Sequence, residues 1–325
     1  MTARTAPADE TEFVTSGHSG DPVRWSRTRV QLETEAVLVA TEFGEHVEQI
    51  VNFAPPSHLY GNLFGRVLPE LLGLVPIDLW GDPLATPALD TDKRTLFVCL
   101  PSSWMVLRSL STTIGSLPGA AVLHGAGPTT AVARKVAAEL NDLTGFRAVE
   151  VFGSTETGAV AVRDVARPEP WRLLSDVDVH DGPAERLLKV RSGRIGRRAD
   201  MVAAPEWWEL NDVVRFVGDR TFEFVGRSSR LIKVNGVRCR LDQVENAVRA
   251  GLPDVDVVCV AVRDAVRGEH YELFHTDPGG AVRTETIWRQ LAGFPVPRAV
   301  YRVGQIPRTI TGKAKVDRLY AAVRG

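Results

Sequence analysis

Short apolar stretches that end in loops of small residues alternate with helical spacing through the first half of the chain. The stretches that end near Phe53, Leu100, His124 and Phe152 each run into a loop rich in proline, glycine or serine. Strands that alternate with helices form mainly parallel sheets, and ligands gather at the carboxyl ends of their strands. The pattern therefore predicts a large α/β domain with a mainly parallel sheet and flanking helices, whose informative loops lie at one edge of the sheet.

Helical spacing is clearest in two segments of this first half. Apolar residues recur at intervals of three or four in residues 28–40 and again in residues 129–143, where Thr129 or Thr130 is the expected cap. A third helix is expected to end near Gly73, despite the proline within it.

The character of the sequence changes beyond about Gly226. Short strand-like segments then alternate with helix-like ones, which predicts a small α+β domain at the C-terminus. We therefore expect three parts: a disordered tail at residues 1–12, a large domain at residues 13–227 and a C-terminal domain at residues 228–325.

Charge and cysteine usage exclude several classes of protein. The 39 lysine and arginine residues nearly balance the 40 aspartate and glutamate residues, so the formal net charge is -1. A chain this balanced has no general field to attract nucleic acid or an anionic membrane, and we expect neither as a partner. Cys99, Cys239 and Cys259 lie too far apart for a disulfide framework or a zinc knuckle, which indicates a reducing, cytoplasmic location. No apolar run approaches the roughly 20 residues needed to cross a bilayer, and no signal peptide is expected.

Two glycine-containing loops carry residues suited to phosphate and metal binding. In TSGHSGDP, at Thr15–Pro22, small residues let consecutive N–H groups point at one anion; the alternative is an ordinary flexible loop. In FGSTETG, at residues 152–158, Glu156 can hold Mg²⁺ beside substrate phosphates. The alternative there is a helix N-terminus that Ser154 or Thr155 caps.

Two further motifs lie nearer the C-terminus. Asp212, in ELND, can accept hydrogen bonds from two vicinal ribose hydroxyls, and Arg227 can donate to the same sugar. The alternative is a β-hairpin with a solvated charged rim. Lys313, in IPRTITGK, lies on a glycine-containing loop from which it can reach a neighbouring site as a mobile charge. The alternative is a solvated lysine at the start of the last helix.

These motifs, in this order, resemble those of the adenylate-forming superfamily, which contains acyl-CoA synthetases, nonribosomal-peptide adenylation domains and firefly luciferase. The similarity runs from about Phe13 to Arg318, which is nearly the whole chain. Seven collinear segments carry it, and their shared order is far more specific than any one match. They are TSGHSGDP, APPSHLYG, LHGAGP, FGSTETG, ELNDVV, VGRSSRLIKVNGVRCRLDQVENAV and IPRTITGK.

The resemblance implies a two-step reaction that uses ATP and Mg²⁺. A carboxylate attacks the α-phosphorus of ATP, which gives an acyl adenylate and releases pyrophosphate. The acyl group then passes to a thiol, either of coenzyme A or of the phosphopantetheine of an acyl or peptidyl carrier protein. Between the steps the C-terminal domain is expected to move as a lid about a hinge at Ser229, which brings Lys233 and Gly236 to the site for the thiol step.

The resemblance also implies a role for individual residues. Glu156 holds Mg²⁺, Thr155 contacts the α-phosphate, and Lys313 bridges the carboxylate and the α-phosphate. The acyl pocket contains His58, Tyr60, Gly61 and His124, with His58 either a gate or a packed, hydrogen-bonded histidine. The residues expected to bind ATP are Thr15, Ser16, Gly17, Ser19, Gly20, Gly125, Ala126, Gly127, Phe152, Gly153, Ser154, Thr155, Asp212 and Arg227.

The chain departs from the family pattern at several points. Val23 occupies the position of the phosphate-loop lysine, with Arg24 beside it as a cation that can replace it. Phe152 replaces the signature tyrosine, and Ser229 replaces the hinge aspartate or lysine. Family members carry a large portion before the phosphate loop, whereas this loop begins at Thr15. We therefore expect a compact member of the family. One hypothesis is a homodimer in which the partner covers the walls of the large domain that the missing portion would supply.

The sequence leaves the acid and the acceptor open. We expect an aryl or short acyl acid, because such pockets are mostly apolar with a few polar contacts, and compactness favours a carrier protein as acceptor. Two other classes remain: a ligase that passes its acyl adenylate to an amine or another nucleophile, and a degenerate protein that binds nucleotide or acyl group without catalysis. The absence of G-x-S-x-G and H-E-x-x-H argues against a hydrolase of the nucleophile-elbow type and a zinc protease.

Overall fold

The structure of the protein is a computed structural model, and Cα packing divides the chain into two compact units. The first comprises Met1–Pro183, Leu188–Leu210 and Phe216–Glu223, and the second comprises Ala184–Leu187, Asn211–Arg215 and Phe224–Gly325. The structure describes residues 9–16, 22–43, 46–127, 129–144, 146–167, 169–234, 236–264, 268–277, 279–280, 282–309 and 314–324. The expected domain boundary at 227/228 stays a prediction.

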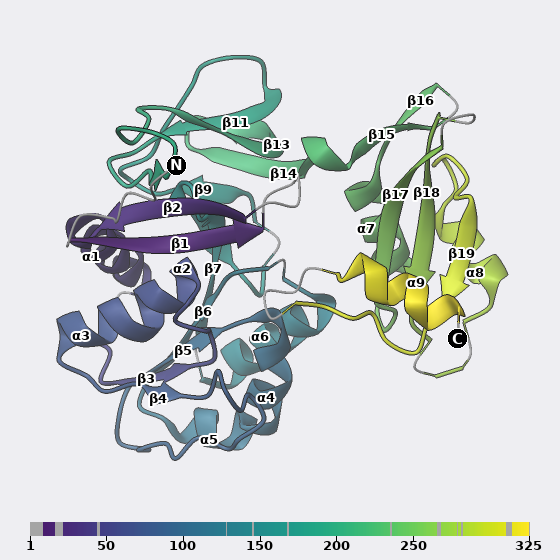
Figure 1. The fold of residues 1–325 in the computed structure, drawn as a ribbon. Coiled ribbons are helices and arrows are strands. Elements are labelled where there is room, and N and C mark those ends of the chain that lie inside the picture. Colours follow the sequence, from purple (N-terminus) through teal and green to yellow (C-terminus); the bar gives the residue numbers. More distant parts are fainter. Residues whose placement is uncertain are drawn as a thin grey trace. The chain divides into compact units, whose positions relative to one another are not determined.

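An 11-stranded sheet has the order β10-β11-β13-β14-β9-β8-β7-β6-β5-β3-β4 (Figure 1). Most of it belongs to the first unit, while parts of β11, β13 and β14 belong to the second. Strands β3 to β7 pair in parallel, as predicted from the alternation of strands and helices. Their bounds are β3 Gln49–Asn52, β4 Ile77–Asp78, β5 Thr95–Cys99, β6 Ala120–His124 and β7 Arg147–Ser154.

The other half of this sheet corrects the expectation of a mainly parallel sheet. Antiparallel pairs join β7 to β8, β8 to β9, β9 to β14 and β10 to β11, so the sheet is mixed. The physical reason is that short turns, rather than helical crossovers, connect several of these strands, and short turns join antiparallel neighbours. The bounds are β8 Gly158–Asp164, β9 Trp171–Leu173, β10 Asp178–Val179, β11 Glu185–Arg191, β13 Trp208–Gly218 and β14 Thr221–Arg227.

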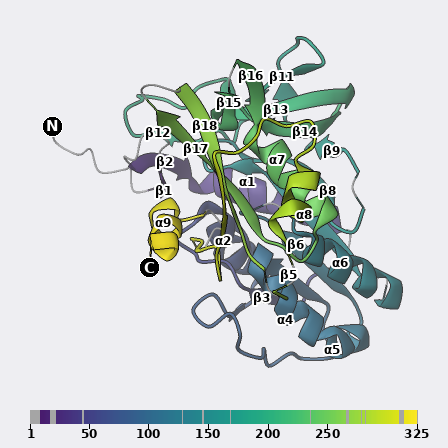
Figure 2. The ribbon, with the colours of Figure 1, turned by 90° about the vertical axis from the view of Figure 1, so that its right-hand side faces the viewer.

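Helices cover both faces of the parallel half, with α1 to α3 on one face and α4 to α6 on the other (Figures 1 and 2). Thr28 caps α1 because its hydroxyl accepts the N–H of Gln31, while Gly73 ends α3 in the left-handed conformation. Thr130 caps α6 by accepting the N–H of Ala133. The bounds are α1 Arg29–Ala40, η1 Thr41–Phe43, α2 Leu59–Asn62, the π-helical turn η2 Leu63–Val67, α3 Leu68–Leu72, η3 Pro101–Ser103, α4 Trp104–Ser109, α5 Ser111–Ser116 and α6 Ala131–Thr144.

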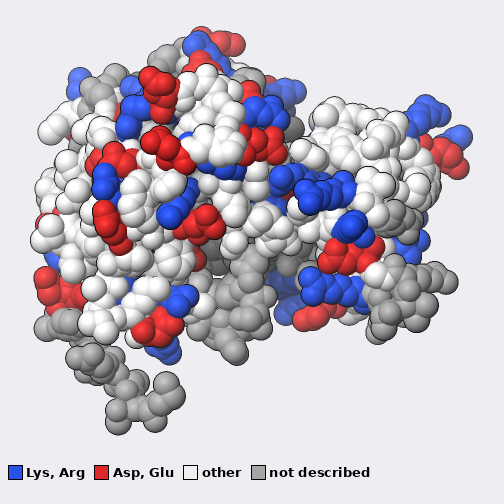
Figure 3. Space-filling view, turned by 90° about the horizontal axis from the view of Figure 1, so that it is seen from above, with Lys and Arg blue, Asp and Glu red and all other residues white. Residues whose placement is uncertain are grey.

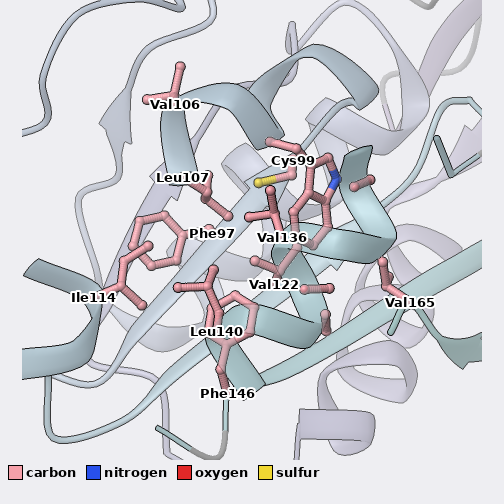
Figure 4. Close-up of a cluster of buried hydrophobic side chains, with 14 of the residues drawn as sticks. Phe97, Cys99, Val106, Leu107, Ile114, Val122, Val136, Leu140, Phe146 and Val165 are labelled. Carbon is pink, nitrogen blue, oxygen red and sulfur yellow. The ribbon is translucent and has the colours of Figure 1, made fainter. Parts of the chain in front are cut away.

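A buried apolar cluster holds α4, α5 and α6 on the sheet. Phe97 and Val122 project from β5 and β6 into a space that Leu107, Ile114 and Leu140 fill from the helices (Figure 4). All five are essentially inaccessible to water. Each such side chain contributes about 1.5–3 kcal/mol by leaving water, so this cluster fixes the helices relative to the loops at the sheet edge.

A small three-stranded sheet of order β1-β2-β12 lies near the N-terminus, with β1 Glu10–Ser16, β2 Pro22–Thr28 and β12 Arg197–Arg198. Strand β1 pairs with β2 from Glu10 opposite Thr28 to Ser16 opposite Pro22. Residues 10–12, which we expected in a disordered tail, are therefore part of a strand. The reason is that their backbone groups pair with those of β2, and paired groups are ordered even where the side chains are polar. Residues 1–8 of that tail lie outside the described residues.

The second unit contains a five-stranded sheet of order β16-β15-β18-β17, with β19 beside β18. Helices α7 and α8 supply Val244 and Ile287 to one apolar core, and α9 supplies Leu319 to a second core with Phe274. This agrees with the α+β pattern of the sequence. The bounds are η4 Ser228–Arg230, β15 Leu231–Val234, β16 Val237–Arg240, α7 Leu241–Gly251, β17 Val257–Asp264, β18 Gly268–His275, α8 Thr284–Gln290, β19 Ala299–Arg302 and α9 Val316–Arg324.

The charged surface agrees with the balanced composition. Acidic and basic side chains are interspersed over the described part of the face in Figure 3. In the part of the chain that the structure describes, no helix is long and apolar enough to cross a membrane.

Candidate functional site

Two of the predicted loops leave the same edge of the sheet. Strands β6 and β7 are adjacent and parallel, with His124 opposite Glu150. The segment Gly125–Gly127 follows β6, and the end of β7 leads into the turn at Thr155–Thr157. Because parallel neighbours end at one edge, the two loops lie where α/β proteins bind ligands.

The loop after β6 contains a residue with a strained backbone, and a buried carboxylate bonds to the segment that follows it. Ala126 has φ 61, and among the described residues it is the one non-glycine residue with positive φ. Such strain persists only where the surroundings impose it, which is common at binding sites. Buried Glu150 provides part of this support, since its Oε1 accepts the N–H of Thr129 at 3.0 Å and its Oε2 accepts from Arg163 Nε at 2.6 Å.

The turn after β7 joins two antiparallel strands, so the alternative of a helix N-terminus at Ser154 or Thr155 is wrong. Ser154 and Thr157 instead bond to each other, with their hydroxyl oxygens 3.1 Å apart. The side chain of Glu156 is partly buried and makes no hydrogen bond or ion pair with the described residues. Its N–H likewise donates to none of them, so both groups can serve a ligand.

Phe152 and Gly153 precede this turn on β7. The Phe152 ring packs against Trp171 at 5.1 Å and Phe222 at 5.5 Å between centroids. Where the family pattern has a tyrosine, the Phe152 ring therefore packs against two aromatic rings of the sheet. A role of Phe152 beside the nucleotide stays a prediction.

A buried ion-pair network lies behind the same turn. Arg27 NH1 donates to Glu35 Oε2 at 3.2 Å, and Arg194 NH1 lies 3.1 Å from the same oxygen. Burial lowers the pKa of the Arg27 guanidinium, although the negative charge of Glu35 opposes this. For Arg194 burial acts in the same direction, but Glu35 and Asp176 outweigh it and raise its pKa. Sequence reasoning missed this network because none of the motifs contains Arg27, Glu35 or Arg194.

The predicted phosphate loop is described only at its base. Thr15 Oγ1 donates to the carbonyl of Val23 at 3.3 Å across the β1–β2 hairpin. Ser16 ends β1, while Gly17, Ser19 and Gly20 lie outside the described residues. Arg24, the expected replacement for the family lysine, forms an ion pair with Glu12 at 2.5 Å on the exposed face of the hairpin.

The predicted acyl-pocket residues lie close together but differ in exposure. Tyr60, on α2, donates its hydroxyl to the carbonyl of Leu123 at 2.6 Å, and its ring covers Gly125 so closely that a Cβ there would lie 2.5 Å away. His58 precedes α2 and is partly buried, and Gly61 is buried within the helix.

His124 is fully buried, and its Nδ1 accepts the indole N–H of Trp104 at 3.0 Å. A buried indole N–H needs an acceptor, and His124 supplies it. The expected place of His124 in the acyl pocket stays a prediction.

The second unit holds the remaining predicted residues. Asp212 on β13 accepts from Arg227 Nε at 3.1 Å. Ser229 lies in the short turn η4, and Lys233 is exposed on β15. Gly236 has φ 86 in the turn between β15 and β16, where a side chain would be strained. Lys313 lies outside the described residues.

The metal-binding capacity of the site fits magnesium best. Among the described residues, no three histidine, cysteine, aspartate or glutamate side chains are grouped to hold a metal ion. Mg²⁺ is commonly bound by one or two carboxylates together with phosphate oxygens and water. The carboxylate of Glu156, which is paired with no residue that the structure describes, suits that mode of binding.

Comparison with known proteins gives the family. No model of a protein family matches the chain. The 4-coumarate–CoA ligase of Rhodobacter capsulatus is 27% identical over 328 residues, which cover 97% of this chain and 77% of that protein. The AMB antimetabolite synthetase AmbE of Pseudomonas aeruginosa is 28% identical over 276 residues, 72% of this chain and 12% of that protein. The chain is similar to enzymes of the adenylate-forming superfamily.

Solved structures agree on the fold. The amide bond synthetase McbA of Marinactinospora thermotolerans has a TM-score of 0.73 at 19% identity, and the match covers 98% of this chain and 70% of that one. The O-succinylbenzoate coenzyme A synthetase MenE of Bacillus subtilis, in complex with ATP and magnesium, has a TM-score of 0.70 at 16% identity and covers 95% and 69%. The α/β fold of this chain is therefore that of these two synthetases.

One feature of the sequence indicates the buried ion-pair network of Arg27, Glu35 and Arg194. Glu35 falls among Leu32, Ala36 and Val39 on the buried face of α1. A carboxylate on the apolar stripe of an amphipathic helix must find a buried partner. That position therefore predicts an internal cation, although it does not say which arginine supplies it.

Proposed function

We propose that this protein is an AMP-forming ligase that activates a carboxylic acid as an acyl adenylate and then transfers the acyl group to a thiol. In the first step a carboxylate oxygen bonds to the α-phosphorus of ATP, and the bond to the β-phosphate breaks, so pyrophosphate leaves. In the second step the thiol sulfur attacks the acyl carbon and AMP leaves, while the thiol proton passes to solvent.

The observation that carries this proposal is the shared edge of β6 and β7. The strained loop Gly125–Gly127 follows β6 at that edge, and β7 runs on from Glu150 to Ser154 before the turn that contains Glu156. Catalysis of phosphoryl and nucleotidyl transfer depends mostly on positioning and on charge stabilisation. An edge with a backbone N–H and a carboxylate, both of Glu156 and both without a partner among the described residues, suits such a reaction.

The residues of this chain divide the work of the first step. Glu156 would hold Mg²⁺, which neutralises charge on the phosphates when bound. Thr155 donates its hydroxyl to an α-phosphate oxygen, and Asp212 with Arg227 holds the ribose. Lys313 places a positive charge between the attacking carboxylate and the α-phosphate, where negative charge builds up in the transition state.

The chemical classes of the acceptor and of the acid are two further proposals. We propose a phosphopantetheine thiol, of coenzyme A or of a carrier protein, because the similar proteins include a CoA ligase and a nonribosomal peptide synthetase. The Tyr60 ring packs over Gly125 beside the loop after β6, and an aromatic ring at this position supports an aryl or short acyl acid.

The test is carboxylate-dependent exchange of labelled pyrophosphate into ATP across a panel of aryl, acyl and amino acids. We expect exchange with at least one aryl or short acyl acid, and we expect Lys313→Ala to lower its rate by about 10²–10³-fold. Lys93→Ala, which changes a surface lysine paired with Asp90, is the matched control. Absence of exchange with every acid, or full activity in Lys313→Ala, would oppose the proposal.

A second stage of the same experiment addresses the acceptor. The acid identified by exchange is supplied with coenzyme A, with a phosphopantetheinylated carrier protein or with a simple amine. Thioester formation with either thiol supports the proposed second step. Amide formation without any thioester would replace it with transfer to nitrogen while leaving the adenylation step intact.

A further inference from the structure

The ion-pair network behind the β7–β8 turn has no part in the reaction as described so far. It joins Arg27 on β2, Glu35 on α1 and Arg194 in the segment before β12, and each is almost completely buried. Buried ion pairs are poor sources of net stability, because the loss of hydration offsets most of the attraction. Their presence beside a candidate site therefore points to a positioning role.

Arg27 links the β1–β2 hairpin, at the base of the predicted phosphate loop, to the turn that carries Glu156. Its NH1 donates to Glu35 and to the carbonyl of Arg194, and its NH2 donates to the carbonyl of Thr155 at 3.0 Å. That carbonyl belongs to the peptide group whose N–H is the N–H of Glu156. One guanidinium thus connects β2, α1 and the backbone of the turn.

Glu35 and Arg194 fix the other side of the turn. Glu35 Oε1 accepts the N–H of Ala159 at 2.7 Å, and Arg194 NH2 donates to the carbonyl of Ala159 at 2.7 Å. Gly158 has φ 72 and lies so close to Glu35 that a Cβ would stand 2.1 Å from its carboxylate oxygen. The turn is therefore held from behind, and no larger residue fits at Gly158 without displacing Glu35.

The contact to Thr155 has an electrostatic consequence. A guanidinium that bonds a carbonyl strengthens the donor at the other end of the same peptide, since hydrogen bonds in a chain polarise one another. The N–H of Glu156 donates to no described residue. A fixed, polarised N–H with no protein acceptor is suited to an anion whose charge increases during reaction.

We propose that Arg27 is a positioning residue of the adenylation step, which holds the Thr155–Glu156 peptide so that its N–H serves a phosphate oxygen of the nucleotide. This inference rests on the proposed function for its chemical role. Arg27 contacts neither substrate nor metal in this account. It acts through the peptide group and keeps the adjoining carboxylate of Glu156 in place.

The first test measures backbone order without any substrate. Hydrogen–deuterium exchange is followed by mass spectrometry in wild type, Arg27→Met and Arg27→Lys. We expect amides of residues 154–159 to exchange at least about tenfold faster in Arg27→Met, with an intermediate rate in Arg27→Lys, while amides of β5 are unchanged. Equal exchange at residues 154–159 in wild type and both variants would overturn the positioning role.

The second test measures catalysis with the acid found by pyrophosphate exchange. We expect Arg27→Met to lower kcat by about 10–100-fold while KM for the acid changes less than about threefold, because the acid does not touch this peptide. Arg27→Lys, which keeps the charge but donates from one atom, should fall between wild type and Arg27→Met. Arg220→Met is the matched control, since Arg220 also bridges two carbonyls, those of Leu174 and Val177.

The outcomes separate this inference from the proposed function. Wild-type protein without exchange on any acid contradicts the proposed function, and hydrogen exchange then still tests the positioning role. Active wild type with equally active Arg27 variants overturns the inference alone. If Arg27→Met does not fold, Arg27→Lys decides: a lowered kcat with unchanged acid KM supports the inference, and wild-type kcat overturns it.

Discussion

The Nε of Arg227 lies 3.1 Å from Oδ1 of Asp212, which joins the two residues that the sequence assigned to one ribose. Asp212 is buried on β13, whereas the Arg227 side chain is 51% exposed at the end of β14. The buried carboxylate is therefore oriented by a cation that remains accessible to a ligand. This geometry satisfies both the ribose hypothesis and its alternative, a hairpin with a charged rim, so a measurement must separate them.

Asp212→Asn tests the ribose hypothesis. The substitution keeps the shape of the side chain but removes the charge and one acceptor, so we expect KM for ATP to rise by about tenfold or more, as loss of a hydrogen bond to a buried charged group costs about 1.5–3 kcal/mol. The measurement is pyrophosphate exchange at varied ATP. The control is Arg215→Met. Arg215 is an exposed arginine on the same strand as Asp212, and it forms an ion pair with Glu185. Unchanged KM in Asp212→Asn would leave the charged rim as the better interpretation.

Glu156→Gln tests the magnesium role. We expect kcat to fall by about 10²–10³-fold because the amide cannot supply the negative oxygen that the metal ion prefers, and the magnesium concentration for half-maximal rate should rise. Thermal stability should stay close to wild type, since this carboxylate is bonded to no described residue. Glu139→Gln, on the surface of α6 beside Lys135, provides the comparison. A variant with wild-type magnesium dependence would remove Glu156 from the mechanism.

Gly125→Ala tests the close contact between the loop after β6 and α2. The added Cβ would lie 2.5 Å from the Tyr60 ring, so the ring must move or the loop must open. We expect destabilisation of about 1–3 kcal/mol, as for other overpacked sites. Tyr60→Phe, which loses the hydroxyl bonds to the carbonyls of Leu123 and Cys99, should cost about 1 kcal/mol. Urea denaturation measures both, and a neutral Gly125→Ala would contradict the packing described here.

Buried thiols predict a decline of stability at alkaline pH. Burial raises the pKa of Cys99 well above its ordinary value and does the same for Cys259. An unfolded thiol ionises near about pH 8.5, whereas the folded thiols stay protonated. Ionisation therefore lowers the free energy of the unfolded state as pH rises and favours unfolding. The stabilisation is complete below that pH and falls by about 1.4 kcal/mol per thiol for each pH unit above it.

The measurement is the free energy of unfolding in urea at pH 7.5 and 9.5. Cys99→Ala removes one of these thiols, so its loss of stability between the two pH values should be smaller than that of wild type. The range stops below the ordinary pKa of tyrosine to keep phenol ionisation out of the comparison. Equal losses in the two proteins would show that Cys99 ionises alike in both states.

Local signals predicted much of the parallel half of the large sheet. Gly73 ends a helix because it adopts the left-handed conformation, and Thr130 caps α6 with its own hydroxyl. These features depend on neighbours within a few residues, which the sequence shows directly. The antiparallel strands after Gly158 were not foreseen, because their pairing depends on contacts between distant segments rather than on a local period.

The candidate site was foreseen in its motifs but not in its support. Thr155 and Glu156 follow a strand and a glycine in the sequence, so their loop was visible. Arg27 and Arg194 are separated by more than half the chain, and only the fold brings them to one carboxylate, that of Glu35. Charged residues are solvated in most proteins, so composition alone favours the wrong interpretation for this network.

The central claim is that an acid oxygen bonds directly to the α-phosphorus of ATP, and the fate of that oxygen tests it most directly. The acid identified by exchange is labelled with ¹⁸O in its carboxylate and converted to product with ATP and a thiol or amine acceptor. The account predicts that each AMP formed carries one ¹⁸O atom from the acid. Label in inorganic phosphate with ADP as the other product, or unlabelled AMP, would contradict the acyl adenylate.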